Sequence, residues 1–480
     1  MEELMREGLK KAQELNASYA DIRWIDTKIE SIQLKNGQVE GLQSITDSGF
    51  GIRVIANGSW GFASSCHFDR DEVLRTADMA VRIAKSSARV QKHEIVMAPQ
   101  GKPVEKKYEN KYKHDPFEVP LEDKLALLSD ASKLMERSDV KLSAAFMSAF
   151  SQHKRLMTTE GTDIEQTLVG CGAGIEATAV SSGESHKRSY PCSFHGNYGT
   201  RGYEFIKKLN LTDHAERVGK EAVALLDADP CPKKTTNLIL DSSQVALQVH
   251  ESCGHPTELD RVLGYESSFA GESFLTLDKR NNFKYGSEFV NINADATIAG
   301  GLGSFAFDDE GTRAQKIRLV SEGNFVGYMM SRETASTLNL TSNGTMRATN
   351  WNRIPLIRMT NVNLQPGSWN FDELIEDTKS GVYMLTNRSW SIDDKRLNFQ
   401  FGTEVAYEVE AGELGRMLKN PVYSGMTPQF WADCDAICGK DDWQLWGVPN
   451  CGKGEPMQII GVGHGAAPAR FKKVKVGVGK

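Results

Sequence analysis

The chain has 480 residues, 40% of them hydrophobic, and a formal net charge of −6 from 57 basic and 63 acidic side chains. This length is enough for at least two domains with their own cores, and the near balance of charges, without a long run of either sign, disfavours nucleic acid as the main partner. The acidic first residues lack the apolar centre of a signal peptide, and no apolar run reaches the length of a membrane span, so we expect a cytoplasmic protein without a membrane partner.

In chain order, the first segment predicts a sheet with helices packed on it. Apolar residues at helical spacing indicate an amphipathic helix over residues 5–15. Residues 19–63 change to short alternating runs that turn at two Asn-Gly dipeptides, residues 36–37 and 57–58, which are typical of hairpins. Asp69 has the position of a helix cap, and the helix that follows it should cover this antiparallel sheet.

The same alternation of helix and strand patterns continues to a boundary near residue 230. A helix is predicted over residues 121–135, strands over residues 140–171 and a further helix over residues 214–227. A polar, proline-containing segment follows. We place the domain division there, which gives an N-terminal α/β domain of residues 1–230 and a C-terminal domain of residues 231–480.

The C-terminal domain is rich in glycine and in short strand-like runs, such as residues 289–292, 317–320 and 405–409. Many short strands separated by turns are typical of a barrel or a sandwich. The predicted fold class is therefore α+β, with an N-terminal antiparallel sheet and its covering helices, and a C-terminal β-rich barrel or sandwich domain that also carries the helix of a metal motif.

That motif is His250-Glu251-Ser252-Cys253-Gly254-His255, which follows an apolar run and the helix-start signal Ser242-Ser243. Two imidazoles can each give a metal ion a neutral nitrogen, and the carboxylate beside the first can act as a base on water. The alternative is a set of polar side chains on a solvated helix. The mostly apolar residues 244–249 argue against it, because they indicate a helix at least half buried, where such a cluster needs a reason to exist.

The spacing of the two histidines requires a deviation from a regular helix. Five residues at roughly 100° each would leave the side chains about 140° apart, too far for one ion. Gly254 suits a left-handed helix end, and Pro256 disfavours a helical conformation for His255. We therefore predict that the helix starting near Ser243 ends, or widens into a single wide turn, between Ser252 and His255.

A catalytic zinc ion usually has a third protein ligand, and the residues leave several candidates. The eight cysteines lack a framework spacing, so we expect reduced thiols, some of them free to bind metal. Cys253 would be crowded between the histidines, and Cys434 and Cys438 are better explained as buried apolar thiols. Cys451 lies in a turn beside a lysine, which favours the thiolate. His464, Glu258 and Asp260 are the other candidates for the third ligand. The alternative for the two acids is that they are partners that hold a ligand imidazole by its other nitrogen.

With these residues laid out, the chain resembles the TldD/PmbA family of metallopeptidases, and more closely its TldD branch. The matching segments are residues 51–54, 60–63, 250–260, 307–311, 358–361 and 451–454. The resemblance implies that His250, His255 and Cys451 hold Zn²⁺ and that Glu251 is the catalytic base. Pro256, after the second histidine, departs from the small residues expected there in relatives.

The resemblance also implies a dimer in which peptides enter a cavity closed by the partner subunit and are held as an added strand. Because this chain keeps every catalytic residue, it is expected either as a homodimer or as the active half of a heterodimer with a related subunit that lacks the metal motif. The leading hypothesis is a zinc-dependent metallopeptidase that cuts short or unfolded peptides in the cytosol. The alternatives are a non-catalytic regulatory or binding protein, since relatives are named as modulators of DNA gyrase, and a metal-dependent amidase that acts on a non-peptide amide.

Overall fold

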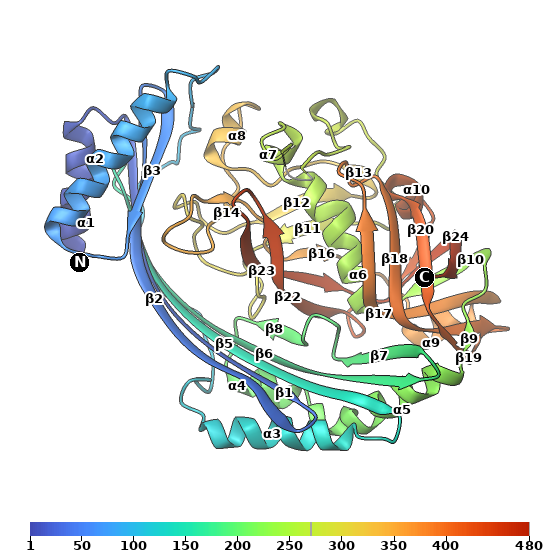
Figure 1. Cartoon of the computed structure of the whole chain (residues 1–480). Helices are drawn as coiled ribbons and strands as arrows, with labels where there is room; N and C mark the ends of the chain where they lie inside the picture. Colours follow the sequence, from blue (N-terminus) through green and yellow to red (C-terminus); the bar gives the residue numbers. More distant parts are fainter. Residues whose placement is uncertain (269–270, 480) are drawn as a thin grey trace.

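The computed structural model describes residues 1–268 and 271–479, and its N-terminal half is built on one long, curved sheet (Figure 1). Its strands run in the order β3-β2-β1-β5-β6-β4, and β7 and β8 also pair with β6. All the pairs are antiparallel except β4 with β6. The strands are β1 Tyr19–Lys35, β2 Gln38–Ala56, β3 Ser59–Ser65, β4 Glu105–Glu109, β5 Val140–Thr158, β6 Asp163–Ser181, β7 Glu184–Tyr190 and β8 Asn197–Gly199.

Both Asn-Gly turns are confirmed. Asn36 and Gly37 have φ values of 49° and 70°, and Asn57 and Gly58 have 51° and 72°, the left-handed conformation that a tight hairpin requires and that these residue types tolerate. Residues 140–158 form one continuous strand rather than separate short runs. Because its strands are this long, the sheet extends across the molecule (Figure 1).

Helices cover the outer face of the sheet, as predicted, while the C-terminal half of the chain lies on its inner face (Figure 1). At one end, α1 (Glu2–Glu14) and α2 (Arg70–Ser87) pack on β1 and β2, and Asp69 caps α2 by accepting a hydrogen bond from the Glu72 amide. At the other end, α3 (Leu121–Leu134), α4 (Tyr203–Lys208) and α5 (Leu211–Asp227) share a core with β5 and β6.

The C-terminal half contains a closed barrel of five strands. The strands pair in the order β17-β10-β24-β20-β18, and β18 pairs back with β17. They are β10 Lys234–Leu240, β17 Ser380–Ile392, β18 Asn398–Glu410, β20 Pro421–Met426 and β24 Ala469–Val478. The α+β class is thus confirmed, and of the two C-terminal alternatives the structure has the barrel. The division of the chain at residue 230 stays a prediction.

Smaller elements surround the barrel. Three short strands extend it: β9 Asp229–Pro230, β19 Glu413–Lys419 and β21 Cys434–Ile437. A four-stranded sheet contains β11 Ile292–Asp295, β12 Lys316–Ser321, β13 Asn324–Phe325 and β16 Val362–Leu364, and two further pairs are β14 Met346–Arg347 with β15 Leu356–Ile357 and β22 Gln444–Lys453 with β23 Gln458–Ala466. The remaining short helices are α7 Leu259–Val262, η3 Leu277–Lys279, α8 Arg332–Ser336, α9 Phe371–Glu376 and α10 Thr427–Ala432.

The two halves of the chain meet through buried ion pairs. Arg53 on β2 lies 2.8 Å from Asp21 and 3.4 Å from Glu310, and all three side chains are almost fully buried. Asp21 lies on β1 of the same sheet, so of these two contacts the Arg53–Glu310 pair is the one that joins the two halves, and breaking it would leave a buried charge without its partner. No helix in the described part of the chain is long and apolar enough to cross a membrane.

Candidate metal centre

The motif lies at the end of a buried helix that leaves the barrel. Helix α6 (Ser242–Val249) follows β10 and starts at Asp241, whose carboxylate accepts hydrogen bonds from the amides of Ser243 and Gln244. The chain then widens into a π-helical turn, η1 (His250–Gly254), and ends in a 3₁₀ turn, η2 (His255–Thr257). The predicted deviation is confirmed, although the wide turn already begins at His250.

The π turn solves the problem of the five-residue spacing. The amide of His255 donates to the carbonyl oxygen of His250, a hydrogen bond between residues five apart. In a turn of this width, residues five apart lie nearly above one another. The imidazole centroids of His250 and His255 are accordingly 4.8 Å apart. Both histidines can therefore face one ion.

The predicted backbone conformations of Gly254 and His255 are both wrong. Gly254 has φ −56° and ψ −66°, which is right-handed rather than left-handed, and His255 keeps a helical conformation at φ −60° and ψ −46° although Pro256 follows it. Gly254 instead leaves room for Met359, because a Cβ there would lie 2.2 Å from Met359 Sδ and the buried Met359 side chain would have to move. The space at Gly254 is limited by Met359, which is distant in the sequence, so the local sequence pattern does not reveal this constraint.

The structure brings His250, His255 and Cys451 together. One nitrogen of each imidazole and the thiol sulfur all lie within 4.8 Å of one another, and His255 Nε2 is 3.9 Å from Cys451 Sγ. With Zn–N bonds of about 2.0–2.1 Å and a Zn–S bond of about 2.3 Å, tetrahedral coordination separates nitrogen and sulfur by about 3.6 Å. The donor set therefore fits one zinc ion after a small contraction.

The other nitrogen of each imidazole is already bound. His250 Nδ1 lies 2.7 Å from His464 Nε2, and His464 Nδ1 donates to the Val362 carbonyl at 3.0 Å. His464 Nε2 must then accept, so His250 carries its proton on Nδ1 and keeps a lone pair on Nε2. His255 Nδ1 is held in the same way by Glu258 Oε2 at 3.1 Å. A carboxylate such as Glu258 is a typical partner of a metal-bound histidine, and His464 fixes the proton of His250 in the same way.

The remaining candidates for the third ligand lie elsewhere. Asp260 pairs with Lys453, whose Nζ is 2.8 Å from both carboxylate oxygens. Among the residues that the structure describes, Cys253, Cys434 and Cys438 are buried thiols outside the cluster. Burial raises the pKa of Cys438 to about 12, and it raises the pKa of the other two even further. None of the three is therefore a thiolate near neutral pH.

Electrostatics favour the metal-binding form of each donor in the cluster. Burial lowers the pKa of both His250 and His255, which keeps the imidazoles neutral. Burial alone would raise the pKa of Cys451, but its close contact with His255 and then the charge of Arg358 outweigh burial, and the pKa of the thiol is lowered; with His255 neutral, the Arg358 guanidinium is the cation that still favours the thiolate. Arg358 also donates to the Cys451 carbonyl at 2.5 Å. The lysine expected to assist the thiolate, Lys453, binds Asp260 instead.

Glu251 is held by a residue that the motif did not indicate. Its Oε2 accepts a hydrogen bond from Arg396 Nη1 at 2.8 Å, and the carboxylate is buried beside the cluster. Arg396 lies in the turn between β17 and β18, with φ 63°. Arg396 and Glu251 are 145 residues apart in the chain, so only the three-dimensional fold brings the pair together.

Comparisons with known proteins agree along the whole chain. Residues 233–477 match a family model described as the PmbA/TldA metallopeptidase C-terminal domain, residues 20–84 match domain 1 and residues 114–226 match the central domain of the same family. A metalloprotease of Methanocaldococcus jannaschii is 32% identical over 93% of this chain and 95% of its own length. A zinc metalloprotease TldD homolog of Saccharolobus solfataricus is 25% identical over 98% of both chains.

Solved structures share the fold. The crystal structure of TldE from Thermococcus kodakarensis superposes with a TM-score of 0.74 over 99% of both chains at 17% identity. A Thermotoga maritima protein described as a proposed modulator of a DNA gyrase has a TM-score of 0.77 over 99% of both chains, also at 17% identity. At this level of identity the likeness concerns the architecture alone.

Proposed function

The chain belongs to the TldD/PmbA family of metallopeptidases, and from this premise we propose that it is a zinc-dependent peptidase that hydrolyses short or unfolded peptides. In this proposal His250, His255 and Cys451 are the zinc ligands and Glu251 is the general base. The observation that carries it is the convergence, at one π turn, of two neutral imidazoles, a cysteine with a lowered pKa and a carboxylate.

A zinc ion in such a site, when bound, lowers the pKa of water to about 7 and polarises the carbonyl of the scissile bond. The side chains of the protein do the rest. Glu251 takes a proton from the attacking water and later gives it to the leaving amine. Arg396 orients the Glu251 carboxylate through its hydrogen bond to Oε2. His464 and Glu258 hold the two imidazoles so that each presents Nε2.

We also propose that the protein acts in the cytoplasm and as a dimer. The structural likeness to TldE supports a heterodimer with a related subunit that lacks the metal motif, and a homodimer is the other form consistent with a complete site. A purely regulatory role has weaker support, because a binding protein needs no carboxylate beside two metal-facing imidazoles. An amidase acting on non-peptide amides would use the same groups.

The test is incubation of the purified protein with a mixed pool of short peptides, with and without a chelator, followed by mass spectrometry of the products. We expect new peptide termini in the untreated sample, their loss with chelator and their return when zinc is added back. A pool left intact by zinc-loaded protein, alone and with its candidate partner subunit, would contradict the proposal.

A further inference from the structure

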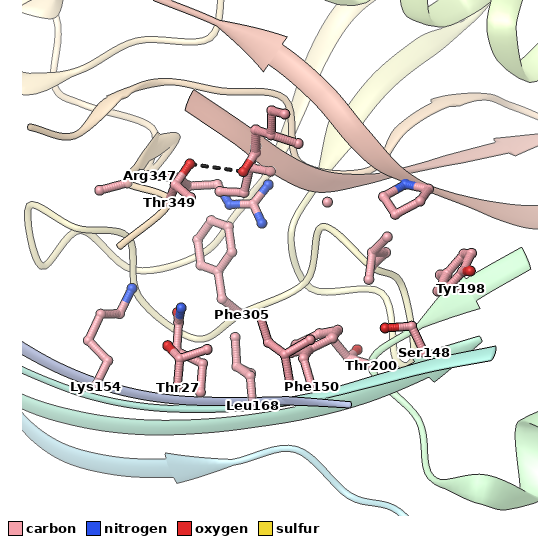
Figure 2. A pocket seen from close by; sticks show the side chains of 18 of the residues that line it. Thr27, Ser148, Phe150, Lys154, Leu168, Tyr198, Thr200, Phe305, Arg347 and Thr349 are labelled. Carbon is pink, nitrogen blue, oxygen red and sulfur yellow. Dashed lines mark hydrogen bonds between the residues drawn. The ribbon is translucent and has the colours of Figure 1, made fainter. Parts of the chain in front are cut away.

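A cavity of about 470 Å³ lies between the inner face of the curved sheet and the C-terminal half of the chain. Its floor is formed by β1, β5 and β6, with Thr27, Phe150 and Leu168 pointing upward, and Arg347 and Thr349 lie on the opposite side (Figure 2). The volume is in the range of small-ligand sites, roughly 300–1,000 Å³. The four residues of the metal centre do not line it.

The walls are largely apolar but contain a guanidinium group. The apolar residues are Ile29, Phe150, Leu168, Leu302, Phe305 and Ile460. Arg347 extends over the Phe305 ring, 5.5 Å from its centroid, and Nη1 donates to the Met359 carbonyl at 2.8 Å. Within residues 1–268 and 271–479, neither Nε nor Nη2 of Arg347 has an acceptor, and no carboxylate lies at ion-pair distance from it. One edge of the guanidinium fork is therefore available to a ligand.

The acids that line the cavity are already engaged. Asp309 forms an ion pair with Lys154 and accepts from the Ala348 amide at 2.7 Å. Both oxygens of Asp308 accept backbone amides, and burial, followed by the charge of Glu310, raises its pKa to about 8. Burial lowers the pKa of Arg347 only to about 10, so it stays protonated near pH 7. The positive charge of Arg347 therefore has no carboxylate partner in the cavity and lies beside an apolar wall.

The cavity also adjoins the metal centre. Ile460, in its wall, is the direct cross-strand partner of Cys451 in the β22–β23 hairpin. Met359, whose carbonyl accepts from Arg347, has its sulfur against Gly254 of the π turn. The cavity therefore lies against the β22–β23 hairpin that carries Cys451 and beside the Met359 side chain that packs on the π turn.

We propose that this cavity is a subsite for a carboxylate carried next to an apolar group, with Arg347 as the residue that binds the anion. A guanidinium edge matches the two oxygens of a carboxylate, and the surrounding rings and aliphatic chains match an apolar side chain. Resting on the proposed peptidase function, the ligand is the C-terminal residue of a peptide substrate. The protein then prefers peptides with a free terminal carboxylate and an apolar last residue.

The test measures binding by calorimetry in the Glu251→Gln background, so that peptides stay intact. The probes are an alanine tetrapeptide extended by a C-terminal phenylalanine, the same peptide with a C-terminal amide, and an amide with one internal glutamate. We expect the free acid to bind at least about tenfold more tightly than either amide, the value typical of hydrogen bonds to a charged group. Adding Arg347→Gln should abolish this difference, whereas Arg318→Gln, an exposed cation on β12, should preserve it.

Three results would overturn the inference: equal binding of acid and amide, a preference that persists with Arg347→Gln, or an internal glutamate that restores tight binding to the amide. If Arg347→Gln does not fold, Arg347→Lys keeps the charge without the fork and should give an intermediate preference. The outcomes also separate the two proposals. Hydrolysis of the peptide pool without an acid preference overturns the subsite alone, whereas an acid preference without hydrolysis supports the subsite and overturns the peptidase.

Discussion

Replacing His464 with alanine tests whether the imidazole behind His250 orients a metal ligand. His464 Nε2 accepts the proton on His250 Nδ1 at 2.7 Å, and the His464 side chain is fully buried. The His464→Ala change leaves that N–H without an acceptor, which costs about 1–3 kcal/mol. The cost falls on the zinc-bound form, because zinc on Nε2 fixes the proton on Nδ1 whereas the metal-free imidazole can carry it on Nε2; at 1.4 kcal/mol per factor of ten, this is about 5- to 150-fold in zinc affinity. Loss of an outer partner of a metal-bound histidine typically costs about 10–100-fold, so the two estimates agree.

The assay is a competition titration of zinc against a chromophoric chelator. We expect His464→Ala to bind the same amount of zinc per chain about 10–100-fold more weakly. His464→Gln should recover most of the affinity, because its amide oxygen can accept the same proton. His153→Ala, at a half-buried histidine paired with Glu165 on the sheet, is the control and should bind zinc like the parent chain. Unchanged affinity in His464→Ala would refute the positioning role, and a loss as complete as that of His250→Ala would make His464 a ligand.

Two further predictions concern the ligand set and the turn that presents it. Cys451→Ser should weaken zinc binding strongly, because it removes a zinc ligand. Cys434→Ser and Cys438→Ser should leave the zinc content, measured by elemental analysis, near that of the parent chain. Equal losses of zinc in all three variants would contradict the assignment of Cys451 as a ligand. Gly254→Ala should lower the free energy of unfolding by about 1–3 kcal/mol in denaturant titrations and reduce zinc affinity, because its Cβ would meet Met359 Sδ at 2.2 Å. Adding Met359→Ala should restore the zinc affinity, and a Gly254→Ala chain with normal stability and affinity would show that the contact is relieved at no cost.

The features that could be predicted from the sequence have local causes. The Asn-Gly dipeptides form tight turns because asparagine and glycine tolerate the left-handed conformation, and Asp69 caps its helix through a neighbour three residues away. The five-residue spacing of the histidines required a wide turn because a regular helix separates them by about 140°. The π turn at His250–Gly254 meets this requirement.

The features that could not be predicted depend on contacts between distant segments. Arg396 lies 145 residues from Glu251 in the chain and contacts it from the turn between β17 and β18. Arg358, rather than the adjacent Lys453, supports the thiolate, because Lys453 is drawn to Asp260. Gly254 is set by Met359, and no local pattern contains that information. A sequence motif identifies the donors, whereas the charges that tune them come from the fold.

The measurement that bears most directly on the proposed site combines zinc content and peptide hydrolysis in one preparation of Glu251→Gln. Because the carboxylate is assigned as a base and not as a ligand, the variant should hold as much zinc per chain as the parent protein and hydrolyse peptides at least about a hundredfold more slowly. Loss of zinc from Glu251→Gln would make Glu251 a ligand, and retained hydrolysis would remove it from the reaction.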